Sequence, residues 1–259
     1  MAQAITSSIA NSGCAKKRIA CFDRNKEKKD LILINGFELK ELEALVKESD
    51  FIFICVKPKD FDSLLNNIAK FINKQILVSI VAGKDSEKMI SIIGNKKVVR
   101  VMPNIAAIVS ESVNAFSAKN LSENEEKEIK LLLSSFGEAI EIEENFFNSV
   151  TAISGCGPAF MAYFIETFSA VAQENGLEKK LADSLVIQTI VGTISLLKND
   201  FSESKIIESV SSPGGATIEG RKILEAGEFE KIIKQTINAS KKKSEELNKK
   251  WKLVQKELL

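Results

Sequence analysis

Phe51 to Val56 reads F-I-F-I-C-V, an apolar run that lacks the alternation typical of a strand with one face in water. An unbroken run of this kind indicates a strand that is covered on both faces. Ile76 to Val81 and Lys97 to Met102 are two further candidates for buried strands. Segments with helical spacing separate the three, at Asp60 to Phe71 and at Asp85 to Ile93. Strands that alternate with helices predict an α/β fold with a doubly wound (Rossmann-type) parallel sheet.

The same alternation extends toward both ends of the chain. Upstream, the spacing predicts a helix at Met1 to Asn11, a strand at Arg18 to Phe22 and a helix at Glu38 to Lys47. Downstream, it predicts an amphipathic helix at Leu121 to Phe136 and an edge strand at Ala139 to Ile142. A doubly wound nucleotide-binding fold opens with a strand and a G-x-G-x-x-G turn, whereas this pattern opens with a helix. We therefore expect the first strand and its glycine turn to be missing from the chain as given.

The composition changes near Asn145, and from there almost every segment is helical. We divide the chain into a dinucleotide-binding domain at 1–145, incomplete at its N-terminus, and an all-α substrate and dimerisation domain at 146–259. Leu181 to Leu197 is apolar nearly all the way round, and such a helix must be buried on every side. A C-terminal domain of this size cannot enclose it alone. The sequence therefore predicts a homodimer.

The composition argues against several classes of function. Lysine and arginine number 36 against 35 aspartate and glutamate residues, so net charge gives no sign of a nucleic-acid partner or an acidic membrane surface. We identify no apolar run near the ~20 residues of a membrane span, and no signal peptide. The four cysteines form no C-x-x-C pair, so we expect neither a zinc or other metal site nor a disulfide framework, and the cytoplasm is the default location. Histidine is absent, so any chemistry depends on hydroxyls, carboxylates, lysines, backbone dipoles or a cofactor.

Ser209 to Glu225 reads S-V-S-S-P-G-G-A-T-I-E-G-R-K-I-L-E and is the main candidate for substrate binding. Pro213 ends the element before it, and the two glycines that follow allow a sharp turn. Ala216 and Thr217 then open a helix, whose free amide groups and positive dipole end form a small anion site. The alternative is an ordinary helix start with Pro-Gly punctuation. A second glycine-rich turn, S-G-C-G-P, offers further amides at Ser154 and Gly155.

Polar or small residues follow the predicted strands at their carboxyl ends, where parallel sheets bind ligands. Asp23 would hold the ribose 2′-hydroxyl of NAD, whereas Arg24 would hold the 2′-phosphate of NADP; a plain polar turn is the alternative for both. Lys57 could face a cofactor or only solvent. Asn104 either bonds to the nicotinamide side of a pocket or caps its own turn. The candidate cofactor residues after these strands are Asp23, Arg24, Asn25, Val56, Lys57, Pro58, Val81, Ala82 and Asn104.

Three motifs, in this order and spacing, resemble pyrroline-5-carboxylate reductase: V-R-V-M-P-N at 99–104, S-G-C-G-P-A at 154–159 and S-P-G-G-A-T at 212–217. The resemblance covers nearly the whole chain. It implies reduction of Δ1-pyrroline-5-carboxylate to L-proline, the last step of proline biosynthesis. It also implies NADPH as the preferred cofactor, with NADH as the alternative, and a homodimer that the family commonly assembles into larger rings.

The resemblance also implies roles for individual residues. The amides of Gly214, Gly215, Ala216 and Thr217 would hold the carboxylate of the substrate. The Thr217 hydroxyl would lie near the ring nitrogen as the catalytic group. Ser154 and Gly155 would approach the substrate from the second glycine-rich turn, giving the remaining substrate contacts that we expect.

The chain departs from the family pattern in places. Cys156 stands where the family usually has serine, and Phe160 where it often has tyrosine; we interpret Cys156 as a packing residue, because no histidine can activate it. M-A-Q-A-I at the start is similar to the end of the family's glycine loop. Met1 and Ala2 are therefore cofactor-binding candidates, and either the start site was set too late, which we favour, or the chain is truncated. Two alternatives stay open: a related imine or β-hydroxyacid reductase, and a catalytically impaired helical dimer.

Overall fold

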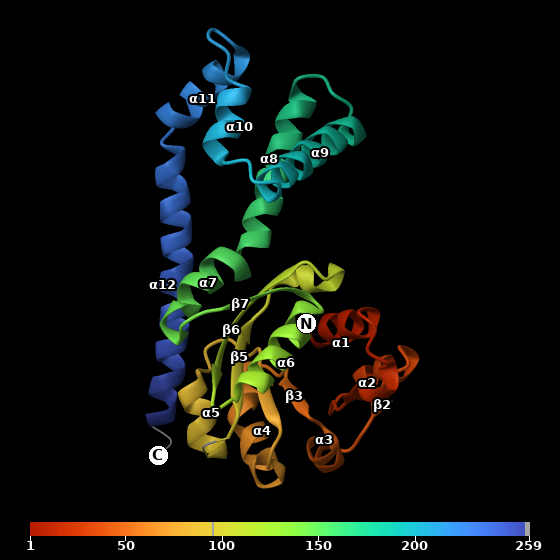
Figure 1. The fold of residues 1–259 in the computed structure, drawn as a ribbon. Coiled ribbons are helices and arrows are strands. Elements are labelled where there is room, and N and C mark those ends of the chain that lie inside the picture. The colour runs from red at the N-terminus through yellow and green to blue at the C-terminus, as the bar shows by residue number, and fades with distance from the viewer. Residues whose placement is uncertain (95, 257–259) are drawn as a thin grey trace. The chain divides into compact units, whose positions relative to one another are not determined.

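The computed structural model describes residues 1–94 and 96–256, which fall into two compact units (Figure 1). The first unit holds residues 1–156 together with the chain from Ser240 onward. The second holds Gly157–Ala239. Each unit is described by itself below, and the domain division at residue 145 remains a prediction.

A five-stranded sheet forms the centre of the first unit. Its strands lie in the order β3 (Phe51–Ile54), β4 (Ile76–Ser79), β5 (Val98–Met102), β6 (Ser112–Lys119) and β7 (Gly137–Glu141). All neighbouring strands are parallel except β5 and β6, which are antiparallel. The doubly wound α/β class and the edge position of β7 agree with the sequence predictions. Strand β6 was not predicted.

Helices cover both faces of this sheet, as a doubly wound fold requires. One face packs against α3 (Leu42–Glu48), α4 (Phe61–Ile68) and α5 (Ser86–Ile93) around Leu77 and Val98. The other face packs against α1 (Ala2–Asn11) and α6 (Glu123–Ser134) around residues that include Val78, Val99 and Val101. The unalternating apolar strands are therefore buried on both sides. Short 3₁₀ segments lie between these elements: η1 (Lys16–Arg18), η2 (Pro58–Asp60), η3 (Ala69–Phe71), η4 (Ile105–Val109) and η5 (Glu144–Phe146).

A separate two-stranded sheet pairs β1 (Ala20–Cys21) with β2 (Glu38–Leu39) in parallel. The single helix predicted at Glu38 to Lys47 is therefore wrong in its first part, because Glu38 and Leu39 pair with β1 and α3 begins only at Leu42. An unpredicted helix, α2 (Lys26–Ile34), joins the two strands.

The first unit closes with α7 (Phe147–Val150), a π-helical turn η6 (Thr151–Gly155) and the second half of α12 (Phe229–Lys256). One side chain joins α7 to α12. The Oδ1 atom of Asn148 accepts hydrogen bonds from Ser244 Oγ at 2.8 Å and from Asn248 Nδ2 at 2.7 Å. The C-terminal helix is thereby fixed to the segment that carries the second glycine-rich turn.

The second unit is helical, as predicted: α8 (Gly157–Glu174), α9 (Lys179–Lys198), α10 (Glu203–Ser209), α11 (Ala216–Ala226) and the first part of α12. Helix α8 ends where Gly176 takes a φ of 92°. The amide of Gly176 donates to the Gln173 carbonyl at 2.9 Å and that of Leu177 to the Ala172 carbonyl at 3.2 Å, a Schellman-type stop. Between the helices, the Ser169 hydroxyl donates to the Asp183 carboxylate.

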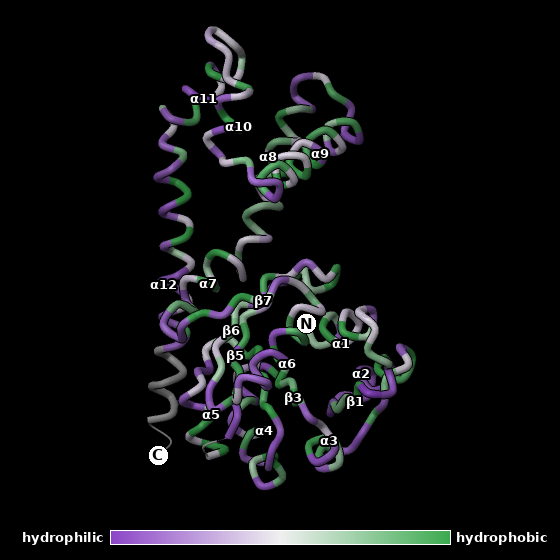
Figure 2. Tube along the Cα trace, viewed as in Figure 1, coloured by the Kyte–Doolittle hydropathy of each residue, from purple (hydrophilic) through white to green (hydrophobic). Residues whose placement is uncertain are grey.

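Helix α9 is not covered by its own chain. Only Ala182 and Val186 are buried among its described residues, whereas Leu185 is 50% and Ile187 51% exposed. Figure 2 shows apolar residues along α8 and α9. By length and composition, 179–198 would also suffice to cross a membrane, which qualifies our sequence-based statement that no apolar run comes near that length. An apolar helix with this exposure needs a covering surface from outside the second unit.

Candidate active site

The predicted cofactor residues in the first unit follow the carboxyl ends of four strands. Asp23 to Asn25 follow β1, Val56 to Pro58 follow β3, Val81 and Ala82 follow β4, and Asn104 follows β5. β1 is parallel to β2, and β3, β4 and β5 are parallel to one another. Ligands of open α/β sheets bind outside the carboxyl ends of parallel strands. The structure therefore places these residues at the carboxyl ends of parallel strands in two sheets, β1-β2 and β3-β4-β5.

The turn after β1 combines a helix cap with an exposed cation. Asn25 is the N-cap of α2, with its Oδ1 atom accepting from the Lys28 amide at 3.1 Å. Its own amide donates to Asp23 Oδ1 at 2.9 Å. The Arg24 side chain is 76% exposed and forms an ion pair with Asp60 at 3.2 Å. Asn25 therefore has a structural role as a helix cap, while Arg24 forms only an exposed ion pair.

Asp60 belongs to the turn after β3, so the Arg24 ion pair connects two of the predicted cofactor segments. Lys57 is exposed in that turn, and Pro58 is the first residue of η2. In the turn after β4, the Val81 amide donates to Ser79 Oγ at 3.2 Å, and Ala82 is exposed.

Met1 and Ala2 form the start of α1, where the positive end of the helix dipole lies. Both residues are exposed. Burial raises the pKa of the Cys55 thiol, at the end of β3, to about 12, while the Met1 ammonium acts in the opposite direction. Ile5 and Ile9 of α1 belong to the same hydrophobic cluster as Phe51 and Phe53 of β3, so the helix packs on the sheet beside this strand. Ser8 fixes the helix to η4 by donating to the Ala107 carbonyl at 2.8 Å.

Asn104 joins the loop after β5 to the second glycine-rich turn. Its Nδ2 atom lies 3.2 Å from the Ser154 carbonyl oxygen and 3.4 Å from Ser154 Oγ. Its Oδ1 atom accepts from the Ala106 amide at 3.0 Å, and its backbone amide donates to Ser112 Oγ at 2.9 Å. Asn104 therefore caps its turn and also contacts a predicted substrate residue.

Ser154 and Gly155 belong to a π-helical turn, η6, which the Cys156 amide closes by donating to the Thr151 carbonyl at 2.9 Å. The Thr151 hydroxyl donates to the Phe147 carbonyl at 2.7 Å. Single π-helical turns are rare and often occur at functional sites. Ser154, Gly155 and Cys156 are all partly exposed, so this turn presents a hydroxyl, backbone groups and a thiol.

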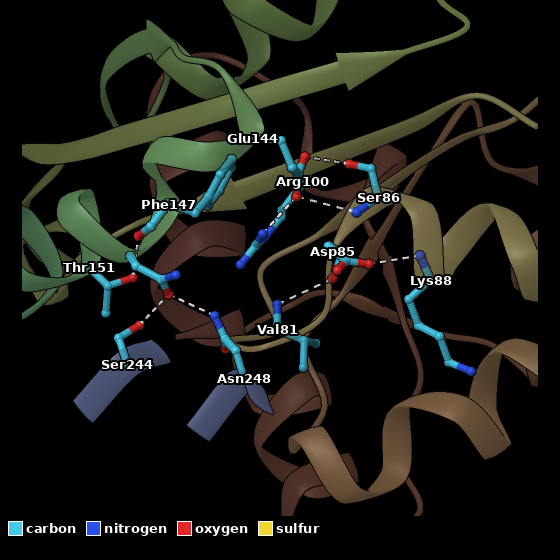
Figure 3. A network of polar contacts seen from close by, with 12 residues as sticks. Val81, Asp85, Ser86, Lys88, Arg100, Glu144, Phe147, Thr151, Ser244 and Asn248 are labelled. Atoms are coloured by element: carbon cyan, nitrogen blue, oxygen red, sulfur yellow. Dashed lines mark hydrogen bonds and ion pairs between the residues drawn. The ribbon is translucent and has the colours of Figure 1, made fainter. Parts of the chain in front are cut away.

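A buried ion pair lies just before this turn in the sequence and holds residues 144–147 (Figure 3). Arg100 Nη1 lies 2.6 Å from Glu144 Oε1, and the guanidinium stacks over the Phe147 ring at 4.0 Å. The Glu144 carboxylate also accepts from Ser86 Oγ at 2.9 Å. Our sequence-based candidates did not include these residues, although an arginine inside the apolar strand V-V-R-V-M was a signal.

The Pro-Gly-Gly turn lies in the second unit. Gly214 has a φ of 72°, which favours glycine. A Cβ atom on Gly215 would lie 2.6 Å from Ser212 Oγ and 2.9 Å from the Ser212 carbonyl oxygen, so a side chain there would force the turn to move. Gly215 is the N-cap of α11, and Ala216 and Thr217 are its first residues. Amides in that first turn have no partner within the helix.

Thr217 is exposed on this turn, next to the predicted anion site. The Ser211 hydroxyl, just before the turn, is buried and has no hydrogen-bond partner among the described residues. In the searched parts, 1–94 and 96–256, no three His, Cys, Asp or Glu side chains are arranged to hold a metal ion. The second unit therefore offers backbone amides for an anion and the Thr217 hydroxyl, while the first unit offers the carboxyl ends of parallel strands.

The chain is similar to known proteins over nearly its whole length. The family model for pyrroline-5-carboxylate reductase dimerisation matches residues 144–247. The model for NADP oxidoreductase, coenzyme F420-dependent, matches residues 1–83. Pyrroline-5-carboxylate reductase of Aquifex aeolicus is 36% identical over 236 residues, covering 90% of this chain and 88% of that protein. Pyrroline-5-carboxylate reductase 2 of Bacillus subtilis is 32% identical over 258 residues, covering 97% and 93%.

Solved structures give the same result. The crystal structure of Plasmodium falciparum pyrroline carboxylate reductase with NADP bound is 30% identical, with a TM-score of 0.85 over 95% of this chain and 94% of that chain. A structure from Coxiella burnetii is 23% identical and shares the fold, with a TM-score of 0.89 over 95% and 94%.

Proposed function

The chain belongs to the pyrroline-5-carboxylate reductase family, and we propose that it reduces Δ1-pyrroline-5-carboxylate to L-proline with NAD(P)H. This reaction is the last step of proline biosynthesis. The single observation that carries the proposal is similarity to reductases of this name over at least nine-tenths of the chain. The glycine-bounded anion site before α11 and the sheet edge of the first unit supply the two kinds of binding that the reaction needs.

The residues of the first unit fit a dinucleotide. The positive end of α1 suits a pyrophosphate, because its first amides have no partner within the helix. Arg24 suits the 2′-phosphate of NADPH, and Lys57 could meet another phosphate oxygen. Ala82 is small and exposed, so a ring could approach the chain closely there, whereas Val81 is buried and could contact the cofactor only through its backbone. When bound, the cofactor supplies a hydride, and the protein binds and orients the substrate.

The amides at Gly214 to Thr217 hold the substrate carboxylate in this proposal. A carboxylate at a helix N-terminus accepts several N–H donors and is favoured by the dipole. The Thr217 hydroxyl hydrogen-bonds at the ring nitrogen, where the positive charge of the protonated imine is lost as the C=N bond is reduced. Ser154 and Gly155, on the π-helical turn of the first unit, remain candidate substrate contacts.

No histidine is needed for this chemistry. The ring nitrogen takes its proton from solvent, and the protonated imine accepts hydride at carbon. The protein contributes position and electrostatic complementarity, which supply most of the rate in such reactions.

An assay of NADPH oxidation with product analysis tests the proposal. We expect proline to form in one-to-one amount with NADPH consumed when Δ1-pyrroline-5-carboxylate is added. The control is a panel of other cyclic imines and β-hydroxyacids assayed at equal concentration. Turnover of a panel member without turnover of pyrroline-5-carboxylate would move the chain to a related reductase. Absence of NADPH binding in a titration would support the impaired helical dimer instead.

We further infer a homodimer in the cytoplasm. The matched dimerisation region, 144–247, includes the exposed apolar helices α8 and α9. A second copy of the chain supplies a matching apolar surface, so pairing buries both. All four cysteines are free thiols, as expected in a reducing compartment. A ring of such dimers is the larger assembly that the family resemblance suggests, and sedimentation velocity would detect it.

A further inference from the structure

Arg100 is a buried cation in the middle of the apolar strand β5. It is 5% exposed, and its sheet neighbours in register are Ser79 on β4 and Ser117 on β6. The other residues of the strand, V-V-R-V-M, are apolar and buried. Taking a charge out of water is costly, and an apolar residue at such a position is often as stable or more so. Packing alone therefore does not explain an arginine here.

The guanidinium makes two contacts at once with the start of the segment 144–156. One nitrogen lies 2.6 Å from Glu144 Oε1, and the plane covers the Phe147 ring at 4.0 Å (Figure 3). Arginine can do both because its charge is spread over a flat fork, whereas the lysine ammonium is a compact point charge. Phe147 is 2% exposed, so the stacked pair is enclosed.

Glu144 is itself held at both oxygens. Oε2 accepts from Ser86 Oγ at 2.9 Å, and Oε1 accepts from the Ser86 amide at 3.4 Å. Ser86 is the first residue of α5, where the helix dipole favours a negative charge. The carboxylate is thus fixed relative to β5 and α5 together, and it cannot shift without losing several partners.

The far end of the same segment is attached to the same strand. Asn104, which follows β5, donates to the Ser154 carbonyl at 3.2 Å. Between the two attachments, the Thr151 hydroxyl donates to the Phe147 carbonyl at 2.7 Å. The π-helical turn that follows contains Ser154, whose carbonyl contacts Asn104. Arg100 and Asn104 are separated by only four positions of one extended strand and its loop, so they define a short rigid base for the segment.

We propose that Arg100 is a positioning residue for the reaction: it fixes 144–156 on β5 so that Ser154 and Gly155 are correctly placed against Asn104. This inference rests on the proposed function. It predicts that loss of Arg100 misplaces the π-helical turn and slows the chemical step, while the cofactor contacts after β1, β3 and β4 remain. A misplacement of about 1 Å can cost on the order of 100-fold in rate.

The test compares three variants with a control on the same strand. Arg100→Met removes the charge and the fork, Arg100→Lys keeps only the charge, and Phe147→Leu keeps the ion pair but removes the stacking. Lys97→Met is the control, because Lys97 also forms an ion pair beside β5, with Glu125, but lies before the strand rather than toward the site. Each dimer is assayed for kcat, for KM with both substrates and for thermal unfolding.

For Arg100→Met we expect kcat to fall roughly 10- to 100-fold. KM for NADPH should change by less than about threefold, because no proposed cofactor contact is lost. Arg100→Lys should recover part of kcat, and Lys97→Met should keep it whatever it does to stability. If Arg100→Met does not fold, a kcat loss in Phe147→Leu gives the same information. A folded Arg100→Met with kcat within about twofold of wild type would overturn the proposal.

Hydrogen exchange gives a readout that does not depend on turnover. Amides in 147–156 should exchange faster in Arg100→Met than in wild type. In Lys97→Met their exchange rates should equal those of wild type. Equal exchange in Arg100→Met and wild type would overturn the positioning role. An inactive wild-type enzyme would instead refute the proposed function, and the exchange comparison would still decide whether Arg100 holds the segment.

Discussion

The side-chain amide of Asn104 lies 3.2 Å from the carbonyl oxygen of Ser154, a residue 50 positions later in the chain. This hydrogen bond joins the loop after the central strand β5 to the π-helical turn. Because Asn104 is only 9% exposed, the bond is formed largely away from water, where an unpaired carbonyl is costly. Asn104 was predicted to bind the cofactor and Ser154 the substrate. The hydrogen bond therefore links a cofactor candidate directly to a substrate candidate.

Asn104→Asp tests that hydrogen bond. The substitution keeps the oxygen that caps η4 but replaces the donor with an oxygen that faces the Ser154 carbonyl. We expect kcat/KM for pyrroline-5-carboxylate to fall by roughly 10- to 100-fold, because a donor is lost and like partial charges meet. Ser154→Ala is the comparison variant: it keeps the backbone carbonyl and removes only the hydroxyl, the more distant acceptor at 3.4 Å and a predicted substrate contact, so we expect a smaller loss. Equal losses in the two variants would assign the effect to the Ser154 hydroxyl instead.

Thr217→Ala tests the proposed catalytic hydroxyl. Thr217 is exposed in the first turn of α11, so its loss removes no buried packing. We expect kcat to fall on the order of 100-fold, as for loss of one transition-state hydrogen bond, with little change in NADPH affinity or thermal stability. Thr217→Ser should retain most of the turnover because the hydroxyl remains. Wild-type turnover in Thr217→Ala would contradict the role.

Arg24→Ala tests the choice between the two dinucleotides. The Arg24 side chain is 76% exposed and paired only at the surface with Asp60, so an incoming phosphate can take it over at small cost. We expect KM for NADPH to rise by about tenfold or more, while KM for NADH changes little. Asp60→Asn is the matched variant, which frees Arg24 and should leave NADPH binding equal or tighter. Equal effects of Arg24→Ala on both cofactors would exclude a contact with the 2′-phosphate.

Much of the fold follows from local sequence, and the exceptions have physical causes. The apolar runs at β3, β4 and β5 were predicted because burial on both faces removes the polar residues from a strand. Strand β6 was not predicted, since buried polar residues interrupt its pattern. Asn114 is an example: its Nδ2 atom donates to the Leu133 carbonyl at 2.8 Å, while its buried Oδ1 atom has no partner among the described residues. Strand β2 is two residues long, too short for any period to show.

Some residues of the candidate site could likewise be predicted from local sequence, and others could not. Residues at the ends of the predicted strands could be identified because parallel sheets place ligands there. The contact of Asn104 with Ser154, and that of Arg100 with Glu144, depend on tertiary structure across 50 and 44 positions. A local pattern carries no information on such pairs. The arginine within a buried strand was the only local sign of the second one.

Acid should weaken the junction of α8 and α9 through Asp183. The Ser169 hydroxyl and then the Lys179 ammonium hold the pKa of that carboxyl below its usual value. A carboxyl with a lowered folded pKa stabilises the native state above its unfolded pKa, and that contribution is lost as pH falls through the folded pKa. We expect denaturation midpoints of wild type to drop as the pH is lowered below about 4. Asp183→Asn should be less stable at neutral pH and should lack this part of the pH dependence; parallel curves would exclude Asp183 as its source.

Leu185→Arg tests whether α9 is the dimer surface. Leu185 is 50% exposed on a helix whose described residues are mostly uncovered by their own chain. A charge at the centre of a self-complementary apolar interface is placed there twice by the two-fold symmetry, so it should favour the monomer strongly. We expect sedimentation to show monomers at micromolar concentration and turnover to fall with the dimer fraction. Leu131→Arg is the control, because Leu131 is 76% exposed on α6, outside the matched dimerisation region, and should leave the dimer intact. A dimer that persists in Leu185→Arg but dissociates in Leu131→Arg would place the interface on the first unit.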